Sequence, residues 1–373
     1  MKQNMMQTNL IKQIIFLSLF LLLITSCARD QRTREPSDIN IKDTTLWSIT
    51  NRTIPPPKGA SEIFYKSIKS TSKPDPLPVM STPDNAEAWK VFQKNRDSIN
   101  ALTALDLARN TQVNIEELSM NGVIVRQVIP IKVDEVFAKT LFIHLHGGAY
   151  TFNTGMAGLI EAIVLADRLQ IRVLSIDYRM PPDHPFPAAQ DDAIAVYKKV
   201  MADYPDYNLI LGGTSAGGGL TMSTVLRLKN ENIKLPSALF AGTPWTDLTK
   251  TGDSYFINDG IDRFLVLYEG VLEESALLYA GNNDLKHPYI SPIYGDFSGF
   301  PPTFLLTGTR DLFLSNTVRA HRKLRDAGVT ADLVVLEGIS HGDYLIVLDA
   351  PESVASFLDL KNFLQNNLNN DFK

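Results

Sequence analysis

The stretch Leu209-Ile-Leu-Gly-Gly-Thr-Ser-Ala-Gly-Gly-Gly-Leu220 decides the fold that we predict for this chain. Its apolar residues 209–211 indicate a buried strand, and the residues after Gly217 can begin a helix. Between them, residues 213–217 fit Gly-x-Ser-x-Gly, which in a strand–turn–helix context is typical of an exposed nucleophilic serine. The turn is so tight that any Cβ beside the serine would collide. Ser215 is therefore a candidate nucleophile, although the pentapeptide alone could be a simple loop in a chain with 22 glycines.

Strand and helix patterns alternate on both sides of this stretch. Strands are predicted at 113–120, 123–131, 140–146, 172–178, 209–211, 237–243, 302–309 and 331–338, and the principal helices at 156–170, 188–200 and 314–327. The turn pair Asn121-Gly122 predicts a hairpin between the first two strands. Alternation of this kind predicts an α/β fold with a mostly parallel, doubly wound sheet of about eight strands. Ligands bind such sheets beyond the carboxyl ends of the strands.

Groups suited to acyl transfer follow several of these strand ends. The strand at 140–146 leads into His146-Gly-Gly-Ala-Tyr150, where glycine lets backbone N–H groups approach a substrate oxygen to about 3 Å. Asp311 follows the strand at 302–309, and His341 follows the strand at 331–338. Asp284 and Asp332 also follow the serine, but neither ends a strand at this edge of the sheet, and Asp332 begins one at the opposite edge. The preferred acid is therefore Asp311.

Several further segments extend this pattern in one order along the chain. They are His146-Gly-Gly-Ala-Tyr150, Asp177-Tyr-Arg-Met-Pro-Pro-Asp-His-Pro-Phe-Pro-Ala-Ala189, Gly213-Thr-Ser-Ala-Gly-Gly218, Pro244-Trp-Thr-Asp-Leu248, Gly308-Thr-Arg-Asp311 and Ser340-His-Gly342. Together they resemble the hormone-sensitive-lipase-like family of α/β-hydrolase esterases over about residues 141–344. The order serine, aspartate, histidine is also the order of that fold.

The resemblance implies a serine carboxylesterase. Ser215 would attack the ester carbonyl, His341 would act as general base, and Asp311 would orient the imidazole. The oxyanion would be held by three backbone N–H groups, those of Gly147, Gly148 and Ala216. Because the base must be neutral, activity should fall away below about pH 6.

Three residues depart from the usual pattern of the family. Ala149 replaces the third glycine of His-Gly-Gly-Gly, and Thr214 replaces the aspartate before the serine. Asp183 replaces a glutamate in the segment 179–187, which we call the proline loop. None of these changes removes a reacting group. The first would shift the oxyanion donors slightly, and the sequence does not disclose what Thr214 does.

Composition and motifs predict no metal and no cofactor. One cysteine and six histidines exclude a zinc cluster built on Cys-x-x-Cys, and no dinucleotide loop or Walker motif is present. His144 and His146 share a face of their strand, but structural roles are favoured, one ordering the oxyanion loop through hydrogen bonds and the other packing. The net charge of −5 gives no sign of a nucleic-acid surface.

The N-terminus predicts export and a lipid anchor. The apolar run 14–24 has the length of a signal peptide and ends in Ile24-Thr-Ser-Cys27, which resembles the bacterial lipobox. We therefore expect a signal peptide at 1–26, a lipid on Cys27, a tether at 27–45 and a location in the bacterial cell envelope. An uncleaved anchor, or a signal cut elsewhere, is the alternative.

The remaining segments predict a helical cap. Residues 46–112 and an insertion at about 247–288 interrupt or precede the strand–helix rhythm of the catalytic domain at 113–373. In the family that the chain resembles, such regions cover the active site, and short- to medium-chain esters are preferred. A deacetylase of glycans, an amidase using the same triad, or a surface binding protein without catalysis are the alternatives.

Overall fold

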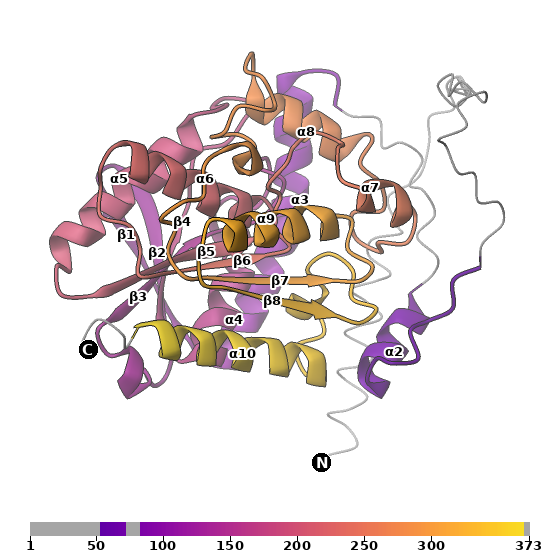
Figure 1. Cartoon of the computed structure of the whole chain (residues 1–373), viewed down its shortest axis with the longest axis horizontal. Coiled ribbons are helices and arrows are strands. Elements are labelled where there is room, and N and C mark those ends of the chain that lie inside the picture. The colour runs from indigo at the N-terminus through magenta and orange to yellow at the C-terminus, as the bar shows by residue number, and fades with distance from the viewer. Residues whose placement is uncertain (1–52, 72–82, 369–373) are drawn as a thin grey trace. The chain divides into compact units, whose positions relative to one another are not determined.

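The computed structural model describes residues 53–71 and 83–368, which are coloured in Figure 1. The predicted signal peptide at 1–26, Cys27 and the tether at 27–45 lie outside the described residues. Within these two ranges, no helix is both long and apolar enough to cross a bilayer. Residues from Pro57 onward fall into one unit, which contains all the elements discussed below.

An eight-stranded sheet forms the centre of this unit, in the order β1-β2-β4-β3-β5-β6-β7-β8. The strands are β1 (Asn114–Met120), β2 (Val123–Ile129), β3 (Thr140–Leu145), β4 (Arg172–Ile176), β5 (Asn208–Thr214), β6 (Ala238–Gly242), β7 (Thr303–Gly308) and β8 (Ala331–Leu336). β2 pairs antiparallel with β1 and β4, and all other neighbours are parallel. This sheet confirms the predicted fold class.

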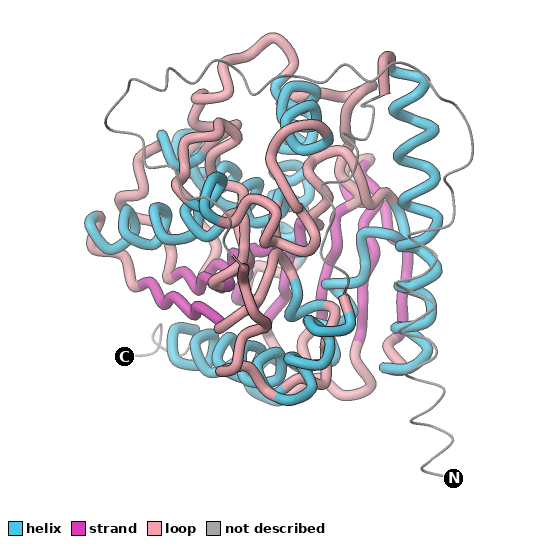
Figure 2. The backbone as a smooth tube through the Cα atoms, turned by 90° about the vertical axis from the view of Figure 1, so that its right-hand side faces the viewer, coloured by secondary structure: helices cyan, strands magenta, loops and turns pink. Residues whose placement is uncertain are grey.

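Helices lie on both faces of the sheet (Figures 1 and 2). The main ones are α3 (Ala86–Thr111), α4 (Leu159–Leu169), α5 (Ala188–Asp203), α6 (Ala216–Asn230), α9 (Leu314–Asp326) and α10 (Pro351–Leu368). Apolar side chains of α4 and α10 form one core layer, and those of α5, α6 and α9 contribute to the other. Because both faces are covered, the central strands carry apolar runs rather than a clean alternation.

β3 shows how the two layers divide its side chains. Phe142 packs with the α4 and α10 layer, whereas Leu141, Ile143 and Leu145 pack with the opposite layer. Side chains two apart on a strand share a face, so His144 projects to the α4 side with Phe142. This placement matters because α4 supplies the carboxylate that His144 meets.

Differences from the predicted boundaries have local causes. The predicted hairpin forms, with Asn121 and Gly122 at φ values of 52° and 83°, the left-handed region that its turn requires. β2 ends at Ile129 because Pro130 has no N–H to donate to the ladder. The helix predicted from residue 156 begins as a 3₁₀ turn, Gly155–Gly158, before α4 starts.

The two segments predicted as a cap are helical and contain no strand in their described parts. The first holds α2 (Glu62–Ser70) and α3, and the second holds α7 (Ser254–Ile257) and α8 (Val271–Ala280) between turns. In Figure 1, the arrowheads of β7 and β8 point toward the side of the molecule where α7 lies. Service as a cap stays a prediction.

Candidate active site

Ser215 occupies the sharp turn between β5 and α6. Its backbone has φ 63° and ψ −124°, strained values for a residue with a Cβ. The N–H of Ser215 donates to Gly242 O at 2.8 Å, and the N–H of Trp245 donates to Ser215 O at 2.9 Å. The strained turn is therefore held on both sides by the end of β6 and the loop after it.

The glycines of the turn are required by contact with β3. A Cβ at Gly213 or at Gly217 would lie 1.9 Å from Leu145 O, far inside any tolerable contact. The backbone of the turn thus packs directly against the last residue of β3. Sequence reasoning attributed these glycines to the turn alone, and the structure adds this neighbouring strand.

Asp311 and His341 meet beyond the ends of β7 and β8. His341 Nδ1 lies 3.0 Å from Asp311 Oδ1, and both side chains are buried. The carboxylate also accepts from Thr307 Oγ1 at 2.7 Å and from the N–H of Phe313 at 2.8 Å. These bonds fix the carboxylate plane, so the imidazole has one favoured orientation. Asp332 begins β8 at the other edge of the sheet, as predicted.

Nearby carboxylates control the charge on His341. Burial lowers the pKa of the imidazole, but Asp311, followed by Asp262 and Asp343, outweighs burial and raises the pKa above its ordinary value of 6.5. Among the described residues, the Ser215 hydroxyl has no hydrogen-bond partner. Catalytic hydrogen bonds of this kind often tighten only when substrate binds.

The loop after β3 and the first residue of α6 together present three unused backbone donors. Tyr178 OH donates to His146 O at 2.7 Å, and Asn153 Nδ2 donates to Gly147 O at 3.0 Å. The loop carbonyls are therefore held back from the site. The N–H groups of Gly147, Gly148 and Ala216 donate to no described residue, which leaves them available to an oxyanion.

Helix α3 supports this loop from outside the sheet. The buried Asp97 carboxylate accepts the N–H groups of Asn153 and Thr154 at 2.7 and 3.0 Å, and Thr154 Oγ1 at 2.6 Å. Ala149 and Tyr150 both have positive φ, 53° and 61°, so the loop is tightly curled where the family glycine is missing. The support from α3 stabilises a backbone that alanine and tyrosine disfavour.

A buried polar network lies beneath Ser215, and we call it the Glu161 network. The Glu161 carboxylate accepts from the N–H of Thr214 at 3.0 Å and from Thr214 Oγ1, and it lies 3.0 Å from His144 Nε2. The Thr214 hydroxyl also lies 2.6 Å from Tyr344 OH, and His144 Nδ1 lies 2.9 Å from Ser175 Oγ. The Glu161 network consists of these five side chains.

The network adds to the roles predicted for the two histidines. His146 has the role expected of one of them, which is to order the loop after β3. Its Nδ1 lies 2.8 Å from Gly147 O, and its ring stacks on Tyr178. His144 is fully buried, in line with the packing role expected of the other histidine, and it also has a polar partner at each ring nitrogen, which the sequence did not predict. No group of three metal-binding side chains occurs in the described part of the chain.

A run of aromatic rings connects the oxyanion loop with His341. Ring centroids are 3.9 Å apart for Tyr150 and Tyr279, 6.1 Å for Tyr150 and Trp245, 5.2 Å for Trp245 and Phe313, and 4.9 Å for Phe313 and His341. Tyr279 belongs to α8, so the insertion contributes directly to the surroundings of the site.

Comparisons with known proteins agree with this arrangement. A family described as alpha/beta hydrolase fold matches residues 142–345, more than half of the chain. An esterase of Acinetobacter venetianus is 28% identical over 68% of this chain and 83% of its own length. The hormone-sensitive lipase of Bos taurus is 29% identical over 40% of this chain and 20% of its own. The crystal structure of esterase E25 superposes with a TM-score of 0.84 at 48% identity, covering 87% of this chain and 99% of that one.

The chain belongs to the hormone-sensitive-lipase-like α/β-hydrolase esterases. It is a carboxylic ester hydrolase, as its named relatives are.

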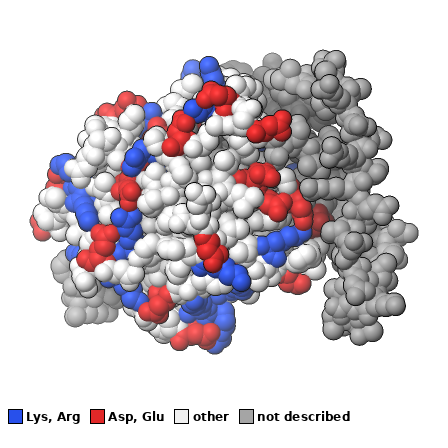
Figure 3. All heavy atoms as spheres, turned by 90° about the horizontal axis from the view of Figure 1, so that it is seen from above, with Lys and Arg blue, Asp and Glu red and all other residues white. Residues whose placement is uncertain are grey.

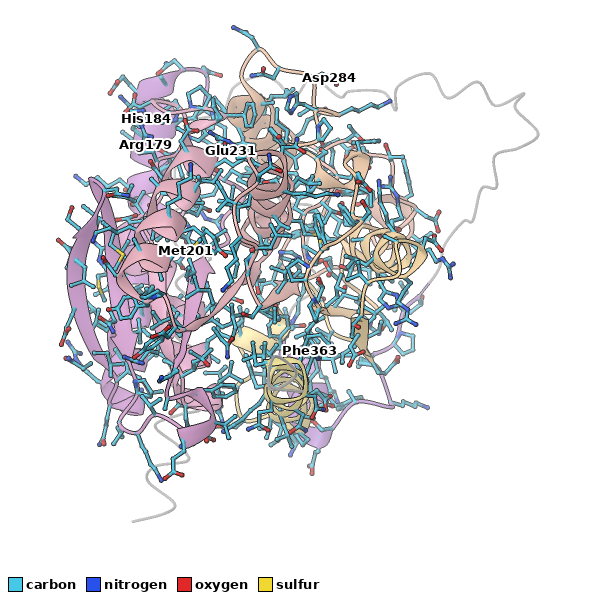
Figure 4. The ribbon with its side chains drawn as sticks, turned by 60° about the vertical axis from the view of Figure 1, so that its left-hand side comes forward. Arg179, His184, Met201, Glu231, Asp284 and Phe363 are labelled. Atoms are coloured by element: carbon cyan, nitrogen blue, oxygen red, sulfur yellow. The ribbon has the colours of Figure 1, made fainter. Side chains whose placement is uncertain are left out.

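Two surface hollows of this esterase lie away from its reacting groups. Hollows of about 370 and 320 Å³ flank α3 and the proline loop and share Gln93 and Thr154, and neither is lined by Ser215, Asp311 or His341. Arg179 and His184, which line the second, lie close together in Figure 4, far from Phe363 of α10.

Sequence reasoning missed several residues that organise the site of the esterase. For Glu161 the sequence did hold one signal, since it is an acidic residue on the apolar face of a predicted helix. Asp97 and Asp262 carried none, because the loop residues that they hold, Asn153 and His341, lie 56 and 79 residues away along the chain.

Proposed function

We propose that this esterase hydrolyses short- to medium-chain carboxylic esters through an acyl-enzyme formed on Ser215. The observation that carries the proposal is the buried pair of Asp311 and His341, 3.0 Å apart, beyond the same edge of the sheet as the strained Ser215 turn. Three backbone donors without described partners beside that turn support it.

Each reacting group has a defined role in the proposed mechanism. Ser215 Oγ attacks the ester carbonyl while His341 accepts its proton, and the carbonyl oxygen becomes an oxyanion. The N–H groups of Gly147, Gly148 and Ala216 stabilise that charge, each worth about 3–4 kcal/mol in comparable sites. His341 then gives the proton to the departing alcohol, and water reverses the steps to release the acid. Asp311 stabilises the imidazolium throughout.

The surroundings favour a neutral, modest-sized acyl group. Tyr150, which follows the Gly147-Gly148 donors, belongs to a buried aromatic cluster in which its ring contacts those of Trp245 and Tyr279. Figure 3, which looks onto the molecule from above, shows acidic and basic residues intermingled around an area of uncharged residues. No charge of a single sign dominates this face.

A labelling and hydrolysis experiment tests this function. The wild-type protein should react with a fluorophosphonate probe and hydrolyse nitrophenyl acetate to octanoate, whereas Ser215→Ala should do neither. Preference for acetylated glycans or anilides over nitrophenyl esters would favour deacetylase or amidase activity. A folded wild-type protein that takes no label would instead favour a binding protein without catalysis.

We also propose that Cys27 carries the lipid that anchors the esterase in the bacterial envelope. The support is the lipobox-like Ile24-Thr-Ser-Cys27 after the apolar run 14–24. Stable anchoring requires more than one acyl chain, since a single chain binds membranes only marginally. Radioactive palmitate should label the wild type and not Cys27→Ser, and labelling of both would refute the anchor.

A further inference from the structure

Asp262 is a buried carboxylate in the insertion that belongs to neither the triad nor the oxyanion loop. It is 0% exposed. Its Oδ1 accepts the N–H groups of Phe264 and Leu265 at 2.9 and 3.1 Å, which fold the insertion around it. Its Oδ2 accepts the N–H groups of Leu312 and His341 at 2.8 and 3.3 Å. One oxygen atom therefore bridges the residue after the triad acid and the triad base itself.

The insertion holds the loop of the acid at further points. Asn258 Nδ2 donates to Asp311 O at 2.8 Å, and Ser254 Oγ donates to Leu312 O at 2.7 Å. These three side chains are all buried and come from one short stretch that includes α7. The loop that carries Asp311 is thus fastened to the insertion rather than only to β7.

Arg263 fastens the loop of the base in a similar way. Its guanidinium bonds to the buried Asp343 carboxylate, with Nε 2.9 Å from Oδ1. The backbone N–H of Arg263 donates to Ser340 Oγ at 3.2 Å. The other oxygen of Asp343 accepts the N–H of Ser340 at 2.9 Å. Arg263 Nη1 also reaches Thr71 Oγ1, just beyond α2, at 2.9 Å. The segment 340–343 is therefore held on both sides of His341.

We infer that Asp262 is a positioning residue for catalysis, holding the loops of Asp311 and His341 in register from the insertion. The inference rests on the proposed function, because it assigns Asp262 a part in placing that triad. The insertion then contributes to assembly of the triad as well as covering it.

A carboxylate suits this position better than a neutral group of the same shape. Four N–H groups converge on Asp262, and an amide would turn its own NH₂ toward two of them. The charged groups around it are Asp311, His341 and the Arg263–Asp343 pair. Burial and the Asp311 carboxylate raise the pKa of Asp262 to about 6. Above that pH its negative charge adds to the field that favours protonated His341.

The test compares Asp262→Asn with Asp259→Asn in the full chain, on nitrophenyl butyrate from pH 5 to 9. Asp262→Asn should lower kcat by roughly tenfold to a hundredfold with little change in KM, as expected when reacting groups are misplaced. The acid limb of its kcat/KM profile should also move to lower pH, because His341 loses a neighbouring negative charge. Asp259, three residues earlier, is exposed and forms no hydrogen bond with either loop in the described structure, so its variant should match the wild type.

A second variant guards against simple misfolding. Asp262→Glu keeps the charge but displaces it by one methylene, so kcat should fall while the acid limb stays near that of the wild type. An Asp262→Asn protein that is less heat-stable but keeps the wild-type kcat and acid limb would overturn the inference. A wild-type protein that neither hydrolyses esters nor takes a fluorophosphonate would overturn the proposed function itself, before any variant is compared.

Discussion

Thr214 stands where the family usually has an aspartate, and its environment explains how the turn works without one. The carboxylate that meets this position comes instead from Glu161 on α4, which binds both the N–H and the hydroxyl of Thr214. The residue preceding the nucleophile is thereby tied to the helix behind the sheet. Thr214 and Glu161 together therefore supply a carboxylate contact at the residue before Ser215.

The variant Thr214→Val tests whether the bond between Glu161 and the Thr214 hydroxyl stabilises the turn. Valine keeps the shape but removes the hydroxyl, leaving a buried Glu161 oxygen and Tyr344 OH with one partner fewer, at a cost of about 1–3 kcal/mol. Urea unfolding should show that loss, and kcat should fall with it. Thr224→Val is the matched control, because Thr224 Oγ1 is buried without a hydrogen-bond partner in the described structure. Equal stability losses in the two variants would contradict the role of Glu161.

The charge state of His341 sets the pH dependence. Its pKa is raised above 6.5 despite burial, chiefly because Asp311 stabilises the imidazolium. Since the base must be neutral, kcat/KM should fall as pH drops through a value above 6.5, higher than the limit near pH 6 expected from an ordinary histidine. Asp311→Asn should move this limb to lower pH while lowering kcat. A wild-type limb well below pH 6 would be incompatible with the Asp311–His341 pair.

At the scale of elements, the turn that carries Ser215 also packs directly against the end of β3. Gly213 and Gly217 lie so close to Leu145 O of β3 that there is no room for a side chain at either position. The strand that leads into the oxyanion loop and the strand that leads into the nucleophile are therefore locked backbone to backbone. In the proposed mechanism, this contact sets the spacing between Ser215 Oγ and the N–H groups of Gly147 and Gly148.

Gly217→Ala should consequently do more damage than an ordinary glycine substitution. Its Cβ would meet Leu145 O at 1.9 Å, so β3 or the turn must move, at the upper end of the roughly 1–3 kcal/mol typical of overpacking. Thermal unfolding followed by circular dichroism measures the loss, and esterase rate should drop further. Gly59→Ala is the control, because its Cβ meets only the flexible side chain of Glu337. Wild-type activity in Gly217→Ala would refute the contact.

Sequence was a good guide to elements and a poor one to the contacts that join them. The strands and the edge carrying Ser215, Asp311 and His341 were predictable because local apolar runs and strand ends encode them. Asp262 was not, because its four donors come from three separate loops. Long-range pairs of this kind depend on tertiary packing and leave no period in the sequence.

At the scale of the whole molecule, the candidate site joins parts held in different ways. The turn that carries Ser215 is held by backbone contacts to β3 and β6. His341 lies on a loop held largely by side chains of the insertion, with the longer 3.3 Å bond to Asp262. Stability within one fold need not be uniform, and loops held by fewer backbone bonds open first.

The backbone hydrogen bonds of Ser215 therefore predict the order in which the esterase loses activity and secondary structure on heating. Because the N–H of Ser215 donates to β6, its hydrogen exchange should be as slow as that of the sheet, whereas the N–H of His341 should exchange sooner. Activity should then disappear several degrees below the circular-dichroism transition, and brief heating in that interval should be reversible. Coincident loss of activity and secondary structure would show instead that nucleophile and base melt as one unit.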